Sequence, residues 1–263
     1  MLRVKVQHPE EVILRVVLFL IRVPFVLLWL ASSLFCVATI YPLVGLQGRS
    51  RLNNMWSRML MAICGVKVQV IGQPVMTGSA LWVANHVSWI DIFILSSVRC
   101  VAFIAKQDIR KWPVIGWLVY KAGTVFIDRT QRNSVRRVGE QMQAMFDTAQ
   151  VVGLFAEGTT STGFDVLPFH ASLFEPPLRA GVVIQPVALR FYQGTQRSDL
   201  LAFVGEQTLV GNMWVLLGAT GSRVEVEFLP PIPPSESQPL GRAEVATLVR
   251  EQIRHAVICA PTS

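Results

Sequence analysis

Cysteine, histidine and charged residues are all scarce in this sequence of 263 residues. It contains four cysteines and four histidines, and only 16% of its residues are charged. The cysteines, Cys36, Cys64, Cys100 and Cys259, are far apart and form no CxxC pair. Disulfides are therefore disfavoured and a reducing compartment is favoured. His86 has no His or Cys at ligand spacing, so we expect no metal site.

Signatures of nucleic-acid binding are also absent from the sequence. We find no zinc-finger spacing, no basic zipper and no RNA-binding aromatic motif, so we expect no nucleic-acid partner. The formal net charge is nevertheless +7, with 52% apolar residues and a mean hydropathy of +0.45. Such a basic, apolar chain fits an anionic membrane surface or a phosphate-bearing substrate.

The apolar excess is concentrated near the N-terminus. Residues 23–42 carry no charge and are long enough to cross a bilayer as a helix. Basic residues flank this run on both sides, so the positive-inside rule gives no orientation. Residues 49–63 have the pattern of an amphipathic interfacial helix. We favour a re-entrant or surface-lying helical pair over a clean span, and expect residues 1–65 to anchor the chain to a membrane.

From residue 66 onward, short β-branched apolar runs alternate with amphipathic segments. The expected strands are 66–71, 80–84, 101–105, 124–128, 151–155, 182–189 and 223–229. The expected helices are 88–97, 107–121, 132–149, 170–180 and 242–258. This alternation predicts a single α/β domain over residues 66–263, with a mixed, partly parallel sheet flanked by helices.

Two proline-containing segments carry expectations of their own. The proline-rich residues 230–239 are expected to form a loop that leads into the last helix. Pro186 interrupts an otherwise continuous apolar strand. Because proline cannot donate to a sheet ladder, it places this strand at an edge of the sheet or marks a bulge.

The expected strand 80–84 leads into Asn85, His86 and Ser88, with Asp91 following. His86 and Asp91 are five residues apart and would lie on different faces of a regular helix. They can meet if His86 lies in the turn before a helix and Asp91 in its first turn. Ser88 followed by Asp91 supports such a helix start, as in a capping box. The pair is therefore either a base with its partner, or a helix cap beside an ordinary turn histidine.

Three further motifs follow this one along the chain. They are GTVFIDR at 123–129, FAEGTTS at 155–161 and VIQPVAL at 183–189. In this order the four blocks resemble NHxSxxD, GxxFIxR, FPEGTRS and the VPV-type block of the glycerolipid acyltransferase family, which includes 1-acylglycerol-3-phosphate acyltransferases. The resemblance covers about residues 66–190 and also extends to a bacterial subgroup that includes lyso-ornithine lipid acyltransferases.

This resemblance implies an O-acyltransferase that uses no cofactor. His86 would be the general base and Asp91 its partner, as in a Ser-His-Asp triad, with the substrate's own hydroxyl as nucleophile. The sequence has no G-x-S-x-G elbow, which agrees with a reaction that forms no acyl-enzyme. The donor would be acyl-CoA or acyl carrier protein. The acceptor would be a lysolipid, with 1-acyl-sn-glycerol-3-phosphate expected first and lyso-ornithine lipid as the alternative. The expected location is the cytoplasmic face of the inner membrane of a bacterium.

The resemblance also assigns residues to the substrate. Glu157 and Gly158 would help to form the acceptor site, and backbone N–H groups around Gly158 are candidates for the tetrahedral intermediate. Thr160 stands where the family has an arginine, so a phosphate would depend on Arg129. The predicted substrate-binding residues are Arg129, Glu157, Gly158, Thr159 and Thr160.

Rival interpretations remain at this point. The same His–Asp pair would serve a thioesterase or a phospholipid transacylase, and a non-catalytic membrane scaffold is the rival outside enzymes. The aromatic cluster of Trp112, Trp117 and Tyr120 has the spacing of core residues and is expected in the core. His170 is expected to have a helix-start or packing role, and residues 208–219 to be core or interfacial.

Overall fold

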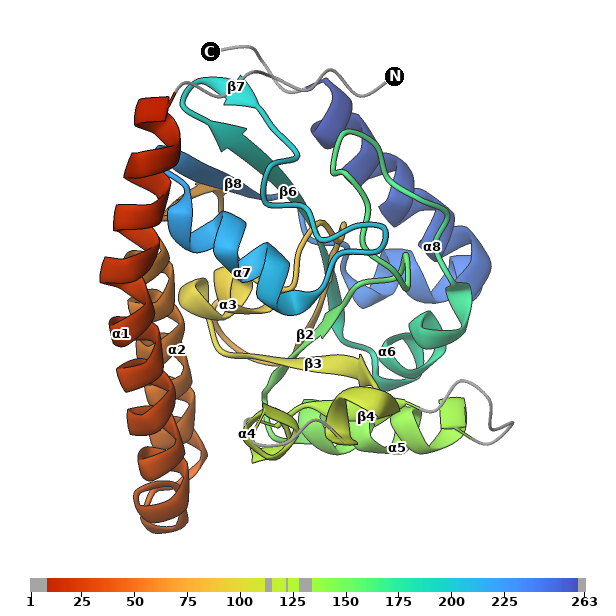
Figure 1. Ribbon diagram of the computed structural model, residues 1–263. Coiled ribbons are helices and arrows are strands. Elements are labelled where there is room, and N and C mark those ends of the chain that lie inside the picture. The colour runs from red at the N-terminus through yellow and green to blue at the C-terminus, as the bar shows by residue number, and fades with distance from the viewer. Residues whose placement is uncertain (1–8, 112–114, 122, 128–133, 260–263) are drawn as a thin grey trace.

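The computed structural model describes residues 9–111, 115–121, 123–127 and 134–259 of the chain. Two long helices run side by side along one flank of a sheet that carries helices on both faces (Figure 1). This arrangement confirms the predicted α/β fold, which a helical pair precedes in the sequence.

The helical pair consists of α1 (Pro9–Thr39) and α2 (Leu46–Cys64), joined through the 3₁₀ turn Tyr41–Leu43. We call these residues, Pro9–Cys64, the hairpin. α1 starts well before the uncharged run at 23–42 and continues through Pro24. The segment Pro9–Leu43 is long and apolar enough to cross a membrane, and its most apolar window is not buried against the rest of the chain.

Part of the hairpin is hydrogen-bonded to the domain and packed against it. Arg22 of α1 donates from Nη1 to the backbone oxygens of Leu217 and Ala219 at 3.0 and 2.7 Å, at the end of α7 (Leu209–Gly218). Leu60 and Met61 of α2 are buried in the same cluster as the sheet residues. The end of the hairpin that carries the turn extends beyond the domain (Figure 1). The division of the chain at residue 65 stays a prediction.

The sheet has eight strands in the described part of the chain, in the order β1-β8-β6-β2-β5-β3-β4, with β7 beside β6. Pairing is parallel except where β6 meets β7 and β8. The strands are β1 (Lys67–Gly72), β2 (Ala80–Ala84), β3 (Val101–Lys106), β4 (Val125–Ile127), β5 (Val151–Leu154), β6 (Val183–Gln193), β7 (Gln196–Arg197) and β8 (Ser222–Phe228). Every expected strand is present, and only the two-residue β7 was not expected.

Each face of the sheet has its own apolar core, because successive strand residues point to opposite faces. Trp82 of β2 belongs to the cluster under α2, α3 and α7, whereas Leu81 and Val83 belong to the cluster under α5, α6 and α8. The helices of the domain besides α7 are α3 (Asp91–Val98), α4 (Ile115–Lys121), α5 (Ser134–Asp147), α6 (Glu175–Ala180) and α8 (Pro234–Ile258). Short 3₁₀ turns at Gln107–Lys111 and Ala171–Phe174 precede α4 and α6.

Three expectations are corrected by the structure. Residues 230–239 are not a loop throughout, because α8 already begins at Pro234 and bends at Gly241, where φ is 73°. Trp117 and Tyr120 are not core residues, since they are 41% and 48% exposed on α4. Trp112 lies outside the described residues.

The third correction concerns Pro186, which does not lie in an edge strand. β6 is paired on both sides, with β2 and with β8. The carbonyl of Pro186 accepts from Leu229 N at 3.0 Å. The N–H and C=O of one strand residue point to the same side, so the N–H that proline lacks would also point toward Leu229. There the regular ladder of β8 has just ended at Phe228, and only the isolated pair Ile184–Ile232 continues. The proline thus coincides with a local break in the ladder of a central strand.

Candidate active site

The first predicted motif begins where β2 leaves the sheet. Asn85 is fully buried, and its side chain bonds the main chain of Leu189 in the neighbouring strand β6. Asn85 Nδ2 donates to Leu189 O at 3.0 Å, and Leu189 N donates to Asn85 Oδ1 at 2.7 Å. This two-way bond fixes the point from which the next residue, His86, leaves the sheet.

The structure brings His86 and Asp91 together as the sequence predicts. His86 Nδ1 lies 2.8 Å from Asp91 Oδ2, with His86 in the turn before α3 and Asp91 at its first residue. The Asp91 side chain is fully buried, whereas that of His86 is 21% exposed. Because a carboxylate accepts hydrogen bonds, Nδ1 donates, and Nε2 of the neutral ring keeps its lone pair.

Asp91 also supplies one half of the expected capping box, to the turn before α3, although the N-cap of α3 itself, Ile90, makes no side-chain cap bond. The role of the pair in catalysis stays a prediction. Asp91 Oδ2 accepts the backbone N–H groups of Val87 at 2.7 Å and Ser88 at 2.9 Å. The reciprocal half of a capping box is missing, since Ser88 Oγ has no hydrogen-bond partner among the described residues. Three donors therefore converge on one carboxylate oxygen and hold the histidine turn rigid against the helix.

Aromatic stacking fixes the plane of the histidine ring. Phe155, at the end of β5, stacks on His86 with ring centroids 4.1 Å apart and planes 12° apart. Phe103 of β3 stacks on Phe155 in turn, with centroids 5.4 Å apart. The sequence analysis did not assign a role to Phe155, although it is the first residue of the third motif.

The third motif holds the main chain of His86. Glu157 is buried, and its Oε1 accepts the N–H of His86 at 2.7 Å, while its Oε2 accepts that of Leu167 at 2.9 Å. Burial raises the pKa of the Glu157 carboxyl above its ordinary value, and the bonds from His86 and Leu167 oppose this shift. Ser161 N donates to His86 O at 2.8 Å. Both backbone groups of His86 are thus bound to this motif.

The remaining predicted residues of the third motif surround this contact. Gly158 has a φ of 73°, a conformation that favours glycine, and its N–H donates to Phe155 O at 3.1 Å. Thr159 is exposed. The Thr160 hydroxyl donates to the carbonyl of Phe203, whose N–H donates to Val87 O at 2.9 Å. The assignment of Glu157, Gly158, Thr159 and Thr160 to substrate binding stays a prediction.

The remaining expectations concern Arg129, a metal site and His170. Arg129 lies outside the described residues. Within the described ranges, no group of three or more His, Cys, Asp or Glu side chains is arranged to hold a metal ion. His170 is exposed, and its N–H donates to Ala156 O at 2.9 Å.

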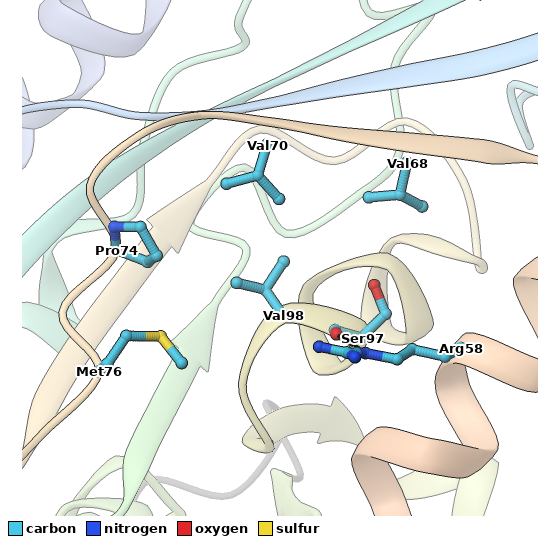
Figure 2. Close-up of a pocket in the computed structure, with 7 residues that line it drawn as sticks. All are labelled: Arg58, Val68, Val70, Pro74, Met76, Ser97 and Val98. Carbon is cyan, nitrogen blue, oxygen red and sulfur yellow. Dashed lines mark hydrogen bonds between the residues drawn. The ribbon is translucent and has the colours of Figure 1, made fainter.

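An apolar groove lies near the other end of α3, away from the His–Asp pair. Figure 2 shows Val68 and Val70 of β1 facing Val98 across this groove, which has a volume of about 490 Å³. Arg58 of α2 lies at one end, where its Nε donates to Ser97 O at 2.8 Å. A second hollow, of about 530 Å³, lies between β6, β8 and α8. Neither hollow is lined by His86 or Asp91.

The sequence is similar to those of known proteins. The family model described as acyltransferase matches residues 67–190, a range that contains all four motifs. The chain is 36% identical to the lyso-ornithine lipid O-acyltransferase of Pseudomonas aeruginosa, over 81% of this chain and 82% of that one. It is 34% identical to a 1-acyl-sn-glycerol-3-phosphate acyltransferase of Neisseria gonorrhoeae, over 70% of this chain and 71% of that one.

The fold has a solved counterpart as well. The crystal structure of PlsC from Thermotoga maritima, a 1-acyl-sn-glycerophosphate acyltransferase, superimposes with a TM-score of 0.71. The two share 22% sequence identity, and the match covers 94% of this chain and 96% of that one. At this identity the likeness establishes the fold, while the relatives above establish the family. The chain belongs to the acyltransferase family and is an enzyme of this class.

Proposed function

We propose that this enzyme transfers a fatty acyl group from an acyl thioester to the free hydroxyl of a lysolipid, with His86 as general base. The observation that carries the proposal is the 2.8 Å contact between His86 Nδ1 and the buried carboxylate of Asp91. This contact directs the Nε2 lone pair away from Asp91, on a ring that keeps part of its surface exposed.

The reaction proceeds by direct transfer. Nε2 of His86 accepts the proton of the lysolipid hydroxyl while the hydroxyl oxygen attacks the thioester carbonyl carbon. The tetrahedral intermediate then collapses, the C–S bond breaks, and the thiolate takes the proton from the imidazolium. Asp91 stabilises the imidazolium in between, and the products are an ester and a free thiol.

Glu157 and Phe155 support the base without taking part in proton transfer. Glu157 fixes the backbone of His86, and Phe155 restricts the tilt of its ring. A base held in this way is pre-positioned for the hydroxyl, and correct positioning contributes several orders of magnitude to rate.

For the acceptor, we propose 1-acyl-sn-glycerol-3-phosphate, with phosphatidic acid as the product. Lyso-ornithine lipid is the second candidate, and a specific observation favours it. Thr160 replaces the arginine of the family motif, and its hydroxyl is already bonded to the carbonyl of Phe203. The P. aeruginosa relative named above is a lyso-ornithine lipid O-acyltransferase. A phosphate would then depend on a cation elsewhere, for which Arg129 is our candidate.

We further propose that the donor is acyl-CoA or acyl carrier protein, and that the hairpin holds the enzyme on the cytoplasmic face of a bacterial inner membrane. The long apolar helix supports membrane association, and so does the similarity of the chain to enzymes named as lipid acyltransferases. Both substrates then meet at the bilayer, where the lysolipid is already present.

The test is a thiol-release assay with purified enzyme, one labelled acyl-CoA and lysolipids of different head groups. We expect thiol release that depends on added lysolipid and yields a labelled diacyl product. Thiol release without lysolipid would indicate a thioesterase. Diacyl product that carries no label and forms without thiol release would indicate a transacylase that uses a phospholipid as donor.

The head group is tested in the same assay with the Arg129→Ala variant. A hydrogen bond to a charged group is worth about 1.5–3 kcal/mol, so we expect kcat/KM for lysophosphatidic acid to fall roughly 10–100-fold. The variant should discriminate less between acceptors with and without phosphate. Faster reaction of the wild type with lyso-ornithine lipid than with lysophosphatidic acid would reject the phosphate proposal.

A further inference from the structure

The helix α4 presents two large aromatic side chains to solvent. Trp117 and Tyr120 are 41% and 48% exposed. With Lys121 they occupy positions i, i+3 and i+4, so the three side chains share one face of the helix. Gly116 is buried, and Leu118 packs against the buried hairpin cluster of Cys36, Val37 and Tyr41. α4 is therefore amphipathic, with its apolar contact toward the hairpin.

The exposed face of α4 is also basic. Arg110 lies in the 3₁₀ turn before α4, with its guanidinium 4.8 Å from the centre of the Tyr120 ring. Lys111 is exposed beside it, 3.6 Å from Asp108, and Lys121 is exposed at the end of the helix. These described residues thus comprise three cations and one carboxylate, so their net charge is positive. We call Arg110, Lys111, Trp117, Tyr120 and Lys121 the α4 surface.

The position of α4 along the hairpin determines how deep α4 lies in a bilayer that the hairpin enters. The cluster of Cys36, Val37 and Tyr41, against which Leu118 packs, lies within seven residues of the turn residue Leu43, about 10 Å or less at the rise of a helix. The hairpin is strongly apolar over this stretch, with Phe35 67% and Leu43 85% exposed. The polar layer of a bilayer is several Å thick on each side of a hydrocarbon core of about 30 Å. A turn that enters one leaflet therefore brings α4 to the level of the lipid head groups.

We infer that the α4 surface is a second membrane contact, which binds anionic lipid head groups beside the inserted hairpin. Tryptophan and tyrosine are enriched at this level because their rings are apolar and their N–H and O–H groups are polar. Lysine and arginine at the same level are attracted by anionic lipids. The inference rests on the proposed anchoring by the hairpin, and is independent of the chemistry at His86.

A membrane fits the α4 surface better than an acidic protein does. Charge complementarity alone would suit acyl carrier protein as well as lipid. The exposed aromatic pair, however, lies on a helix that packs through Leu118 against the hairpin, next to the part of the hairpin where Phe35 and Leu43 are exposed. Exposed aromatic and apolar side chains with cations beside them match a bilayer and its head groups.

The test measures binding of the full-length protein to vesicles of phosphatidylcholine alone or with phosphatidylglycerol. All variants carry Leu43→Asp, which weakens the hairpin so that differences in partitioning are measurable. We expect Lys121→Gln to lower the partition coefficient onto phosphatidylglycerol vesicles about fivefold and to leave phosphatidylcholine binding unchanged. The double variant Trp117→Ala/Tyr120→Ala should bind less to both vesicle types.

Arg242→Gln is the matched control, since Arg242 is an exposed cation on α8, which packs on the other face of the sheet. It should bind like the Leu43→Asp parent. Equal binding of the α4 variants and this control would overturn the inference. So would a Lys121→Gln variant with unchanged vesicle binding and a raised KM for acyl carrier protein, which would assign the surface to an acidic protein. Activity on detergent-dispersed lysolipid should be the same for all variants, and its loss in the α4 variants alone would overturn the inference. Absence of acyl transfer in the parent protein would instead contradict the proposed function.

Discussion

One carboxylate oxygen of Asp91 makes two kinds of contact. Oδ2 accepts from the His86 ring and from two backbone N–H groups of the turn before α3. A helix cap alone would tolerate an amide, because asparagine caps helices as well as aspartate does. A partner for a histidine base would not, because an amide cannot stabilise an imidazolium and favours the wrong tautomer.

The variant Asp91→Asn therefore separates these two functions. We expect kcat to fall about 10²–10⁴-fold, while the free energy of unfolding changes by about 1 kcal/mol or less. Activity and thermal unfolding of the same preparation give both numbers. Normal turnover with normal stability would show that Asp91 serves only as a cap.

The sequence predicts His86 and Asp91 because they belong to one short motif and their geometry depends on a single turn. It does not predict the stacking of Phe155 on His86 or the bond from His86 N to Glu157, which join residues about 70 positions apart. Such contacts depend on the pairing of β2 with β5, which brings the ends of these strands together. A local pattern carries no information about that pairing.

At the scale of elements, strands with strong apolar character were the most predictable. The expected strand 80–84 coincides with β2, which is buried throughout. Errors occurred at two proline-containing segments. Residues 230–239 were expected to form a loop, but Pro239 lies inside α8, just before the bend at Gly241. Pro186 lies inside a central strand, at a local break in the ladder.

The two halves of the hairpin should respond differently to mutation. Leu43→Asp places a charge at the exposed turn, so we expect membrane partitioning to fall at least about tenfold with no change in melting temperature. Arg22→Ala removes two bonds to the end of α7, so it should lower the free energy of unfolding by about 1.5–3 kcal/mol. Vesicle flotation and thermal unfolding of both variants test this. Unchanged partitioning of Leu43→Asp would place the anchor elsewhere.

At the scale of the whole molecule, a buried ionic network ties the sheet to α8. Arg190 of β6 donates to Glu225 of β8 at 3.0 Å and to the backbone of Ala256 in α8 at 2.8 Å. Burial alone would raise the pKa of Glu225, but hydrogen bonds from Tyr192 and Arg190 outweigh it and hold the pKa below the ordinary value. Glu225 therefore stays ionised in the folded protein at pH values where the unfolded chain takes up a proton.

This network predicts a pH dependence of stability. Since the pKa of Glu225 is lower in the folded state, its contribution is complete above the ordinary glutamate pKa near 4.5 and is lost as pH falls through the folded value. We expect Glu225→Gln to be less stable at pH 7 by about 1–3 kcal/mol and to lose less stability on acidification. Denaturant unfolding between pH 7 and pH 4 measures both. Glu140→Gln, at an exposed ion pair of α5, is the control and should match the wild type. Parallel pH curves for Glu225→Gln and the wild type would contradict this assignment.

The central claim is that His86 removes the proton of a lysolipid hydroxyl while it attacks an acyl thioester. The most direct measurement is lysolipid-dependent thiol release by purified wild type and His86→Ala, with melting temperature and vesicle binding recorded for both. We predict that the variant loses about 10²–10⁴-fold in turnover, with its fold and membrane binding intact. Near-normal turnover of a folded His86→Ala protein would contradict the account.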